Sequence, residues 1–214
     1  LGSAHWDIEP HAAGPSVVRE LGALSAVPGG LGVVSEDTIP YQSEALAQRN
    51  ENRANRLERD PAIKCYLPGV PRGMYMPFPV QIIQSQEHIM ILHEFAGAVR
   101  TVYMEDHMEA PADSWMGWSN GHWEGDTLII ETTGFTDSNH LIQAGIITGD
   151  QLTIIERYRV INDGNTLMID FTFIDPEHWE GKWEHTKFRD RVLRSDVKEA
   201  NCIYTDNQVL PGMN

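Results

Sequence analysis

Apolar and polar residues alternate along most of the chain between about residue 80 and residue 192. A period of two is typical of β-strands with one buried face, because successive side chains point to opposite sides of a sheet. The alternation predicts eight strands, at 79–85, 88–95, 98–105, 114–123, 127–133, 151–161, 166–174 and 181–192. Most connections between them are short and carry Gly, Asn or Asp, which favours hairpins. Two connections, 106–113 and 134–150, are longer.

Eight consecutive strands joined mostly by hairpins predict a mostly β fold. We expect an antiparallel up-and-down barrel of about eight strands, because closure leaves no free sheet edge. A sandwich of two sheets is the alternative. A barrel of this size has an interior that side chains fill or that holds one small ligand. The alternation alone does not decide which face of each strand points inward.

The chain divides near residue 60. Residues 1–60 are predicted to form an N-terminal arm and one surface helix packed on the barrel, and residues 61–214 to form the barrel domain. Up to about residue 40 the arm is rich in Gly, Ala and Pro, a composition typical of loops. We therefore expect this part to lie on the surface of the domain.

One helix is expected, over Ser43–Arg59. Ser43 is suited to cap its first turn, and Asp60-Pro61 ends it, since the residue before a proline avoids helical geometry. The four prolines between residues 68 and 79 then predict an extended segment. Its apolar side chains are too many to leave in water, so it is expected to cross an opening of the barrel or to follow its wall.

Composition narrows the classes of partner. With 214 residues, 41% of them hydrophobic and 22% charged, the chain resembles an ordinary globular protein. Its net charge of −15 would repel nucleic acid and anionic membranes, so neither is expected as a partner. No apolar run reaches the ~18 residues of a membrane-spanning helix, so no membrane insertion is expected. Homo-oligomerisation is left open.

The chain start and the two cysteines bear on localisation. The sequence begins Leu1-Gly2-Ser3-Ala4, which suggests a processed end and a leader that is removed. We therefore expect a periplasmic or secreted protein, with a cytoplasmic location as the alternative. Cys65 and Cys202 either form a disulfide, worth roughly 3–5 kcal/mol, or stay two unpaired thiols.

Titratable residues lie among the apolar ones on several strands, as a ligand-holding barrel needs. Histidine titrates near neutral pH, and burial shifts a carboxyl toward it, so both suit proton transfer. Tyr or Arg can stabilise a developing oxyanion. The predicted catalytic residues are His93 and His185 as proton acceptors, Glu131 or Asp170 as the carboxylate, and Tyr103 and Arg100 as oxyanion partners. The alternative for each is a structural role in the core or on the surface.

Aromatic residues and the long connection at 134–150 supply the predicted ligand contacts. Aromatic rings wall a cavity or fill a core. A connection of this length is often a lid over a binding site, and the alternative is a cover for one barrel end. The predicted ligand-binding residues are Trp115, Trp118, Trp123, Tyr75, Phe171, His140 and Asp137.

The motifs of several enzyme classes are missing. The chain has no G-x-G-x-x-G, G-x-x-x-x-G-K-[ST] or H-E-x-x-H. Their absence disfavours dinucleotide and nucleoside-triphosphate sites and zinc peptidases. Neither cysteine belongs to a C-x-x-C pair. We therefore expect no cofactor and no metal. A metal bound by histidines that are distant in sequence is the alternative.

Three stretches carry a family resemblance: DPAIKCYLPGVPRGMYMPFPVQIIQ, GHWEGDTLIIETTGF and IERYRV. From Asp60 to about Val192, the chain resembles a family of bacterial, often exported, proteins. The resemblance implies a lipocalin-like β-barrel and a leader removed on export. It implies no activity, so no catalytic residue is taken from it.

Two hypotheses of function follow. The first is a cofactor-independent lyase or isomerase that uses acid–base catalysis on a small apolar or aromatic molecule in the barrel cavity. The second is a non-catalytic, lipocalin-like carrier of a small hydrophobic ligand, which the lack of a tight catalytic motif favours. A weaker third hypothesis is a structural or partner-binding role through the N-terminal arm.

Overall fold

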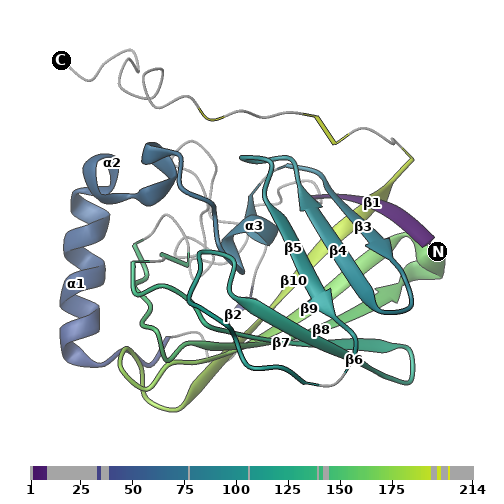
Figure 1. Cartoon of the computed structure of the whole chain (residues 1–214). Helices are drawn as coiled ribbons and strands as arrows, with labels where there is room; N and C mark the ends of the chain where they lie inside the picture. Colours follow the sequence, from purple (N-terminus) through teal and green to yellow (C-terminus); the bar gives the residue numbers. More distant parts are fainter. Residues whose placement is uncertain are drawn as a thin grey trace.

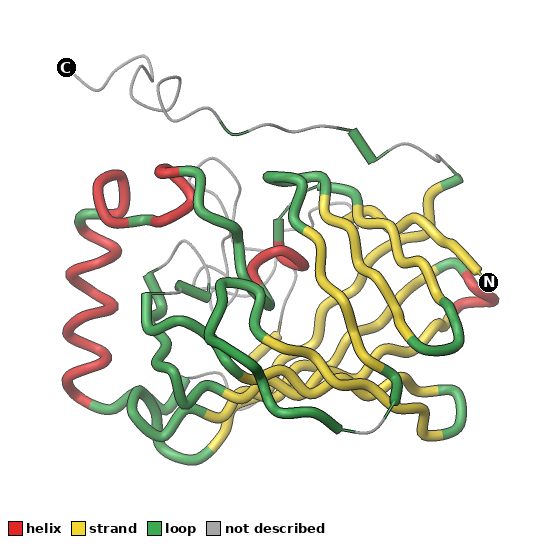
Figure 2. The backbone as a smooth tube through the Cα atoms, viewed as in Figure 1, coloured by secondary structure: helices red, strands yellow, loops and turns green. Residues whose placement is uncertain are grey.

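A curled, ten-stranded β-sheet dominates the computed structural model (Figure 1). The structure describes residues 2–8, 33–34, 39–76, 78–105, 107–138, 140–141, 145–193, 197–198 and 202. The tube in Figure 2 shows the strands gathered on one side of the molecule and the longest helix on the other. Among the described residues, no helix is long and apolar enough to cross a membrane.

All eight strands expected from the alternation are confirmed. They are β3 (Val80–Gln84), β4 (His88–His93), β5 (Val99–Tyr103), β6 (Trp118–Glu124), β7 (Thr127–Thr133), β8 (Thr153–Ile161), β9 (Thr166–Ile174) and β10 (Lys182–Val192). Each pairs with the next in chain order, and all pairs but one are antiparallel. The exception is β5 with β6, which pair in parallel at Val102–Ser119 and Tyr103–Asn120. The long connection between them makes this possible, because a parallel neighbour requires the chain to return along the sheet.

A strand from the predicted arm closes the sheet into a barrel. β1 (Gly2–Ile8) pairs with β3 on one side and with β10 on the other. β2 (Val33–Val34) adds a short second pairing on β10. The barrel is therefore confirmed over the sandwich, but these two pieces of the arm are strands of its sheet and not surface loop. The sequence did not reveal these two strands, because segments of seven and two residues show little periodicity.

The expected helix is confirmed in two parts, α1 (Ser43–Ala54) and α2 (Arg56–Arg59). Figure 1 shows both standing to one side of the strands. The predicted cap is wrong: Ser43 is the first helical residue, and Gln42, which precedes it, makes no side-chain cap. The backbone N–H of Gln42 donates a hydrogen bond to the His178 carbonyl, which fixes Gln42 as the residue before the helix. Ser43 therefore lies inside the first turn.

The proline-rich segment is only partly extended. It is preceded by a 3-10 helix, η3 (Pro61–Lys64), and contains one helical turn, α3 (Arg72–Tyr75). The expectation of a fully extended segment is wrong, because a proline just before a helical turn costs no hydrogen bond. A second 3-10 helix, η4 (Asn162–Gly164), joins β8 to β9.

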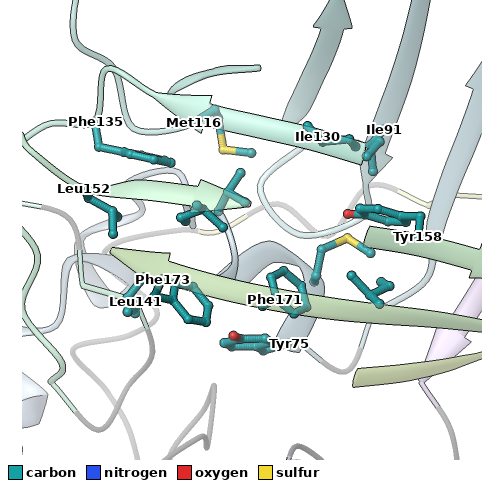
Figure 3. Close-up of a cluster of buried hydrophobic side chains, with 14 of the residues drawn as sticks. Tyr75, Ile91, Met116, Ile130, Phe135, Leu141, Leu152, Tyr158, Phe171 and Phe173 are labelled. Atoms are coloured by element: carbon teal, nitrogen blue, oxygen red, sulfur yellow. The ribbon is translucent and has the colours of Figure 1, made fainter. Parts of the chain in front are cut away.

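A large cluster of the chain's own apolar side chains packs inside the barrel. Phe171 and Phe173 of β9 are fully buried, with Ile130 of β7 across the interior (Figure 3). Tyr75 of α3 packs edge-on against Phe171, at 5.6 Å between ring centroids. The proline-rich segment therefore does pack across the barrel, as expected, and its helical turn contributes to the core.

The two cysteines form a disulfide. Cys65 and Cys202 are 137 residues apart in the chain, and their Cα atoms lie 5.4 Å apart. This resolves the alternatives that the sequence left open. A disulfide is compatible with export, because such bonds persist in oxidising compartments.

Candidate functional site

A buried polar network crosses the barrel interior. Arg100 of β5 forms a bidentate ion pair with Glu156 of β8, and Tyr158 donates a hydrogen bond to the same carboxylate at 2.8 Å. The guanidinium group also donates to Ser119 at 2.8 Å and to Thr132 at 2.6 Å. Burial acts to lower the pKa of Arg100, but the charges of Glu156 and Tyr158 and the hydrogen bonds with them together raise it. Each guanidinium nitrogen is engaged, so the network braces β5 against β8 from within.

His93 and His185, the predicted proton acceptors, both contact α3. The His93 ring lies so close to Gly73 that a Cβ there would be 3.0 Å from it. The Tyr75 hydroxyl is hydrogen-bonded to Nε2 of His185. Burial lowers the pKa of each histidine to about 3, so both are neutral near pH 7. They are only 3% and 2% exposed, and a molecule in solvent does not reach them in this conformation.

The predicted carboxylates point away from these histidines. Glu131 of β7 and Asp170 of β9 each lie between two buried, inward-facing residues, so their side chains face outward. Asp170 forms an ion pair with Arg159 and accepts a hydrogen bond from Thr186 at 2.7 Å. The structure therefore does not bring either carboxylate to the interior histidines, because strand alternation separates them by the thickness of the wall.

Two of the three tryptophans and Tyr103 also lie outside the barrel. Tyr103 stacks on Trp118, with 4.3 Å between centroids and 15° between planes. Trp123 is 47% exposed at the β6–β7 hairpin. Tyr75 and Phe171 belong to the core described above. Of the predicted tryptophans, Trp115 alone lines the cleft that follows.

An outer cleft of about 720 Å³ lies between the helices and the long connections. One side consists of residues from α1, α2, η3 and the turn after it: Gln48, Asn52, Arg59, Pro61, Lys64 and Tyr66. The other side consists of residues from the connections at 104–117 and 134–152: Trp115, Thr136, Asp137, Ser138, His140 and Ile147. The structure thus brings together three predicted ligand-binding residues at one solvent-accessible place.

The long connection is packed down and forms one wall of this cleft. Leu141 and Ile146 are buried in the core, and the Leu141 N–H donates to the Ile146 carbonyl at 3.0 Å. The flanking residues His140 and Ile147 pair as an antiparallel bridge. Of the two roles expected for this connection, its described part fits a cover over one end of the barrel, with polar side chains on its outer side.

Asn52 joins the helix to this connection. Its buried side chain donates to the Gly145 carbonyl at 3.2 Å and accepts from Gln48 at 2.9 Å and from Arg59 at 3.3 Å. Apolar packing of α1 is slight, since Ala45 is its one buried apolar residue. A polar contact therefore joins the helix to the connection on the other side of the cleft.

A pair of stacked rings forms the aromatic part of the cleft. Tyr66 and Trp115 lie 4.8 Å apart between centroids, with 15° between their planes. Tyr66 follows Cys65 of the disulfide, which anchors this turn to the C-terminal part of the chain. Tyr66 is 47% exposed, so the stack presents ring surface to solvent.

His140 is the titratable group of the cleft with a shifted pKa. Burial lowers its pKa, the Asp60 charge acts to raise it, and the charges of Arg72 and Arg59 lower it further. Asp60 and Arg72 form a buried bidentate pair with N–O distances of 2.6 and 2.8 Å. The imidazole is therefore neutral near pH 7 and can accept a proton.

Sequence reasoning missed several residues of these sites. Glu156 shares a strand face with apolar neighbours, and a charge in an apolar stripe is a signal for a buried partner. Lys64, Tyr66 and Arg59 carry no such signal, because they come to the cleft from a helix end and a turn with no regular period.

One more group of potential ligands occurs among the described residues. Atoms of Asp175, Glu177 and His178 lie within 4.8 Å of one another. Burial acts to raise the pKa of Asp175, but hydrogen bonds from His178, Gly149 and Glu177 lower it overall. Since both carboxylate oxygens already accept these bonds, the group serves to hold the turn before β10.

Comparison with known proteins finds no family model that matches this chain and no curated protein that matches its sequence. The resemblance described from the sequence therefore stays a prediction, and the function is argued from the geometry of the chain.

Proposed function

We propose that the protein binds a small planar molecule in the outer cleft. The observation that carries the proposal is the stack of Tyr66 on Trp115 beside an open volume of about 720 Å³. Binding clefts of this size suit drug-sized molecules. This develops the carrier hypothesis but moves the ligand from the barrel interior, where the chain's own side chains pack, to the outside of the barrel end.

Fluorescence titration with the neutral planar probe phenylnaphthylamine tests this proposal. Replacing Tyr66 or Trp115 by leucine should weaken binding about two- to tenfold, since an aromatic pair is worth ~0.5–1.5 kcal/mol. The matched control is Trp123→Leu, an exposed tryptophan on the β6–β7 hairpin, which should bind as the wild type does. Equal binding by all variants would remove the cleft as the site, and loss of binding in Phe171→Leu alone would favour the interior.

A second candidate function is proton transfer at the same cleft, and the neutral His140 favours it. A cofactor-independent lyase or isomerase needs a base that is unprotonated near neutral pH, and a pKa lowered by burial provides one. Asp137 and Ser138 line the same cleft, and the Ser138 hydroxyl donates to Asp137 at 3.1 Å. The interior bases His93 and His185 would serve the same chemistry only if the barrel opened.

Deuterium uptake distinguishes an enzyme from a carrier. Planar ketones and hydroxylated aromatic compounds, incubated with the protein in D₂O, would gain deuterium at carbon if a base removes and returns a proton. His140→Gln should abolish this uptake, and His93→Leu should leave it unchanged. The reverse pattern would place the base inside the barrel. Binding without uptake by the wild type would favour the carrier.

A further inference from the structure

The charges that line the outer cleft are opposite to those of the chain as a whole. The chain has 31 acidic and 16 basic residues, a ratio of about two to one. The cleft reverses it, with Arg59 and Lys64 as cations and Asp137 as its single carboxylate among the lining residues. Cations on the wall of a cleft attract an anionic group of a ligand.

The two cations differ in how they are held. Arg59 forms an ion pair with Glu51 at 2.6 Å and donates to Asn52, so its head group is fixed at the helix side. Lys64 is exposed, and among the described residues no hydrogen bond or ion pair is found for its ammonium group. Of the two cations, Lys64 is thus the one whose head group is available to an anion from solvent.

The lysine and the aromatic stack are two residues apart in one turn. Lys64 ends η3, Cys65 is held by the disulfide, and Tyr66 carries the ring that stacks on Trp115. Cys65 has a left-handed backbone, with φ of 62°, which brings the chain round sharply between its neighbours. Both side chains line the same cleft, so one ligand can contact a cation and a ring together.

From this arrangement we infer that the ligand is a planar molecule with an anionic group, a carboxylate or sulfonate, and that Lys64 binds the anion while the ring lies against the Tyr66–Trp115 stack. The inference rests on the proposed function and adds the charge of the ligand. A compact ammonium binds an anionic oxygen as a point charge. The neutral side chains of His140 and Gln48 line the same cleft.

A pair of probes with the same rings tests the inference. Anilinonaphthalene sulfonate carries the anion and phenylnaphthylamine does not. The sulfonate should bind the wild type about three- to tenfold more tightly, although the net charge of the protein should repel it. Lys64→Gln should weaken binding of the sulfonate about three- to tenfold and change the affinity for the neutral probe by less than about twofold. Raising the salt concentration from about 50 to about 500 mM should weaken binding of the sulfonate but not of the neutral probe.

The matched control is Lys182→Gln, an exposed lysine on β10 that is paired with Glu184 and does not line the cleft. It should bind both probes as the wild type does, and circular dichroism should show that each variant is folded. Equal affinity of the two probes, or no effect of Lys64→Gln, would overturn the anion site and leave the proposed function standing. Failure of both probes to bind would overturn both.

Discussion

Asn52 and Gly145 meet 93 residues apart in the chain, where the side-chain nitrogen of Asn52 donates to the Gly145 carbonyl at 3.2 Å. Gly145 comes so close to the helix that a Cβ there would lie 2.6 Å from the Cβ of Asn52, and its φ is +79°. Glycine is thus required twice at this position, for the close approach and for the backbone angle. This contact holds the two sides of the cleft together.

Gly145→Ala should therefore destabilise the protein and alter the cleft. The left-handed angle costs ~1–2 kcal/mol for alanine, and the steric overlap adds roughly 1–3 kcal/mol. Gly125→Ala is the matched control, since Gly125 has φ of +60° and a Cβ there would meet nothing within 4 Å. Urea unfolding should show a larger loss for Gly145→Ala, with weaker probe binding. Equal losses would mean that the close approach has no energetic consequence.

The Arg100–Glu156 pair should show strong coupling. Removal of one partner, in Arg100→Met or Glu156→Leu, leaves the other charge buried and should cost ~3–5 kcal/mol of unfolding free energy. The double variant should cost less than the sum of the two single variants, because no lone charge is then left. A double-mutant cycle by urea unfolding measures this coupling. Additive losses would show that the two charges do not stabilise each other.

The disulfide should support both stability and the cleft. Replacing Cys65 and Cys202 by serine opens a loop of 137 residues, and loop-closure entropy gives a loss of about 4–5 kcal/mol. Binding of the planar probe should also weaken, because Lys64 and Tyr66 flank Cys65. A reductant should produce the same change in the wild type and no further change in the variant. A wild type that keeps its unfolding midpoint in reductant would contradict the prediction.

The interior histidines should make the protein sensitive to acid. The pKa of His93 and of His185 is about 3 when folded, below the 6.5 of an unperturbed histidine. The unfolded chain therefore binds more protons between these values, so stability is full above about pH 6.5 and falls as the pH drops toward 3. Each histidine should account for about 3 kcal/mol between about pH 7 and about pH 4.

Urea unfolding at the two pH values checks this contribution. His93→Leu should lose about 3 kcal/mol less than the wild type does on acidification, whatever its stability at neutral pH. Ile91→Val, a buried apolar change on the same strand, should be destabilised equally at both pH values. An acid response of His93→Leu equal to that of the wild type would show that this histidine is not the group that titrates.

The sequence by itself determined the eight strands β3–β10, their order and the helix over 43–59. These follow from periods of two and 3.6 residues, which depend on neighbours along the chain. It also singled out Trp115, Asp137 and His140 as candidate ligand contacts, Trp115 for its aromatic ring and the other two for their place in the long connection at 134–150. The resulting expectation of a barrel needed no information beyond the number of strands and the length of their turns.

Only the tertiary structure decided which face of each strand points inward, where the barrel closes and where the cleft lies. β1 completes the wall through pairs with β3 and β10, elements that are far from it in the chain. The cleft takes Lys64 from η3 and His140 from a connection more than 70 residues later. Contacts of this kind depend on how distant segments pack, and local periodicity carries no information about them.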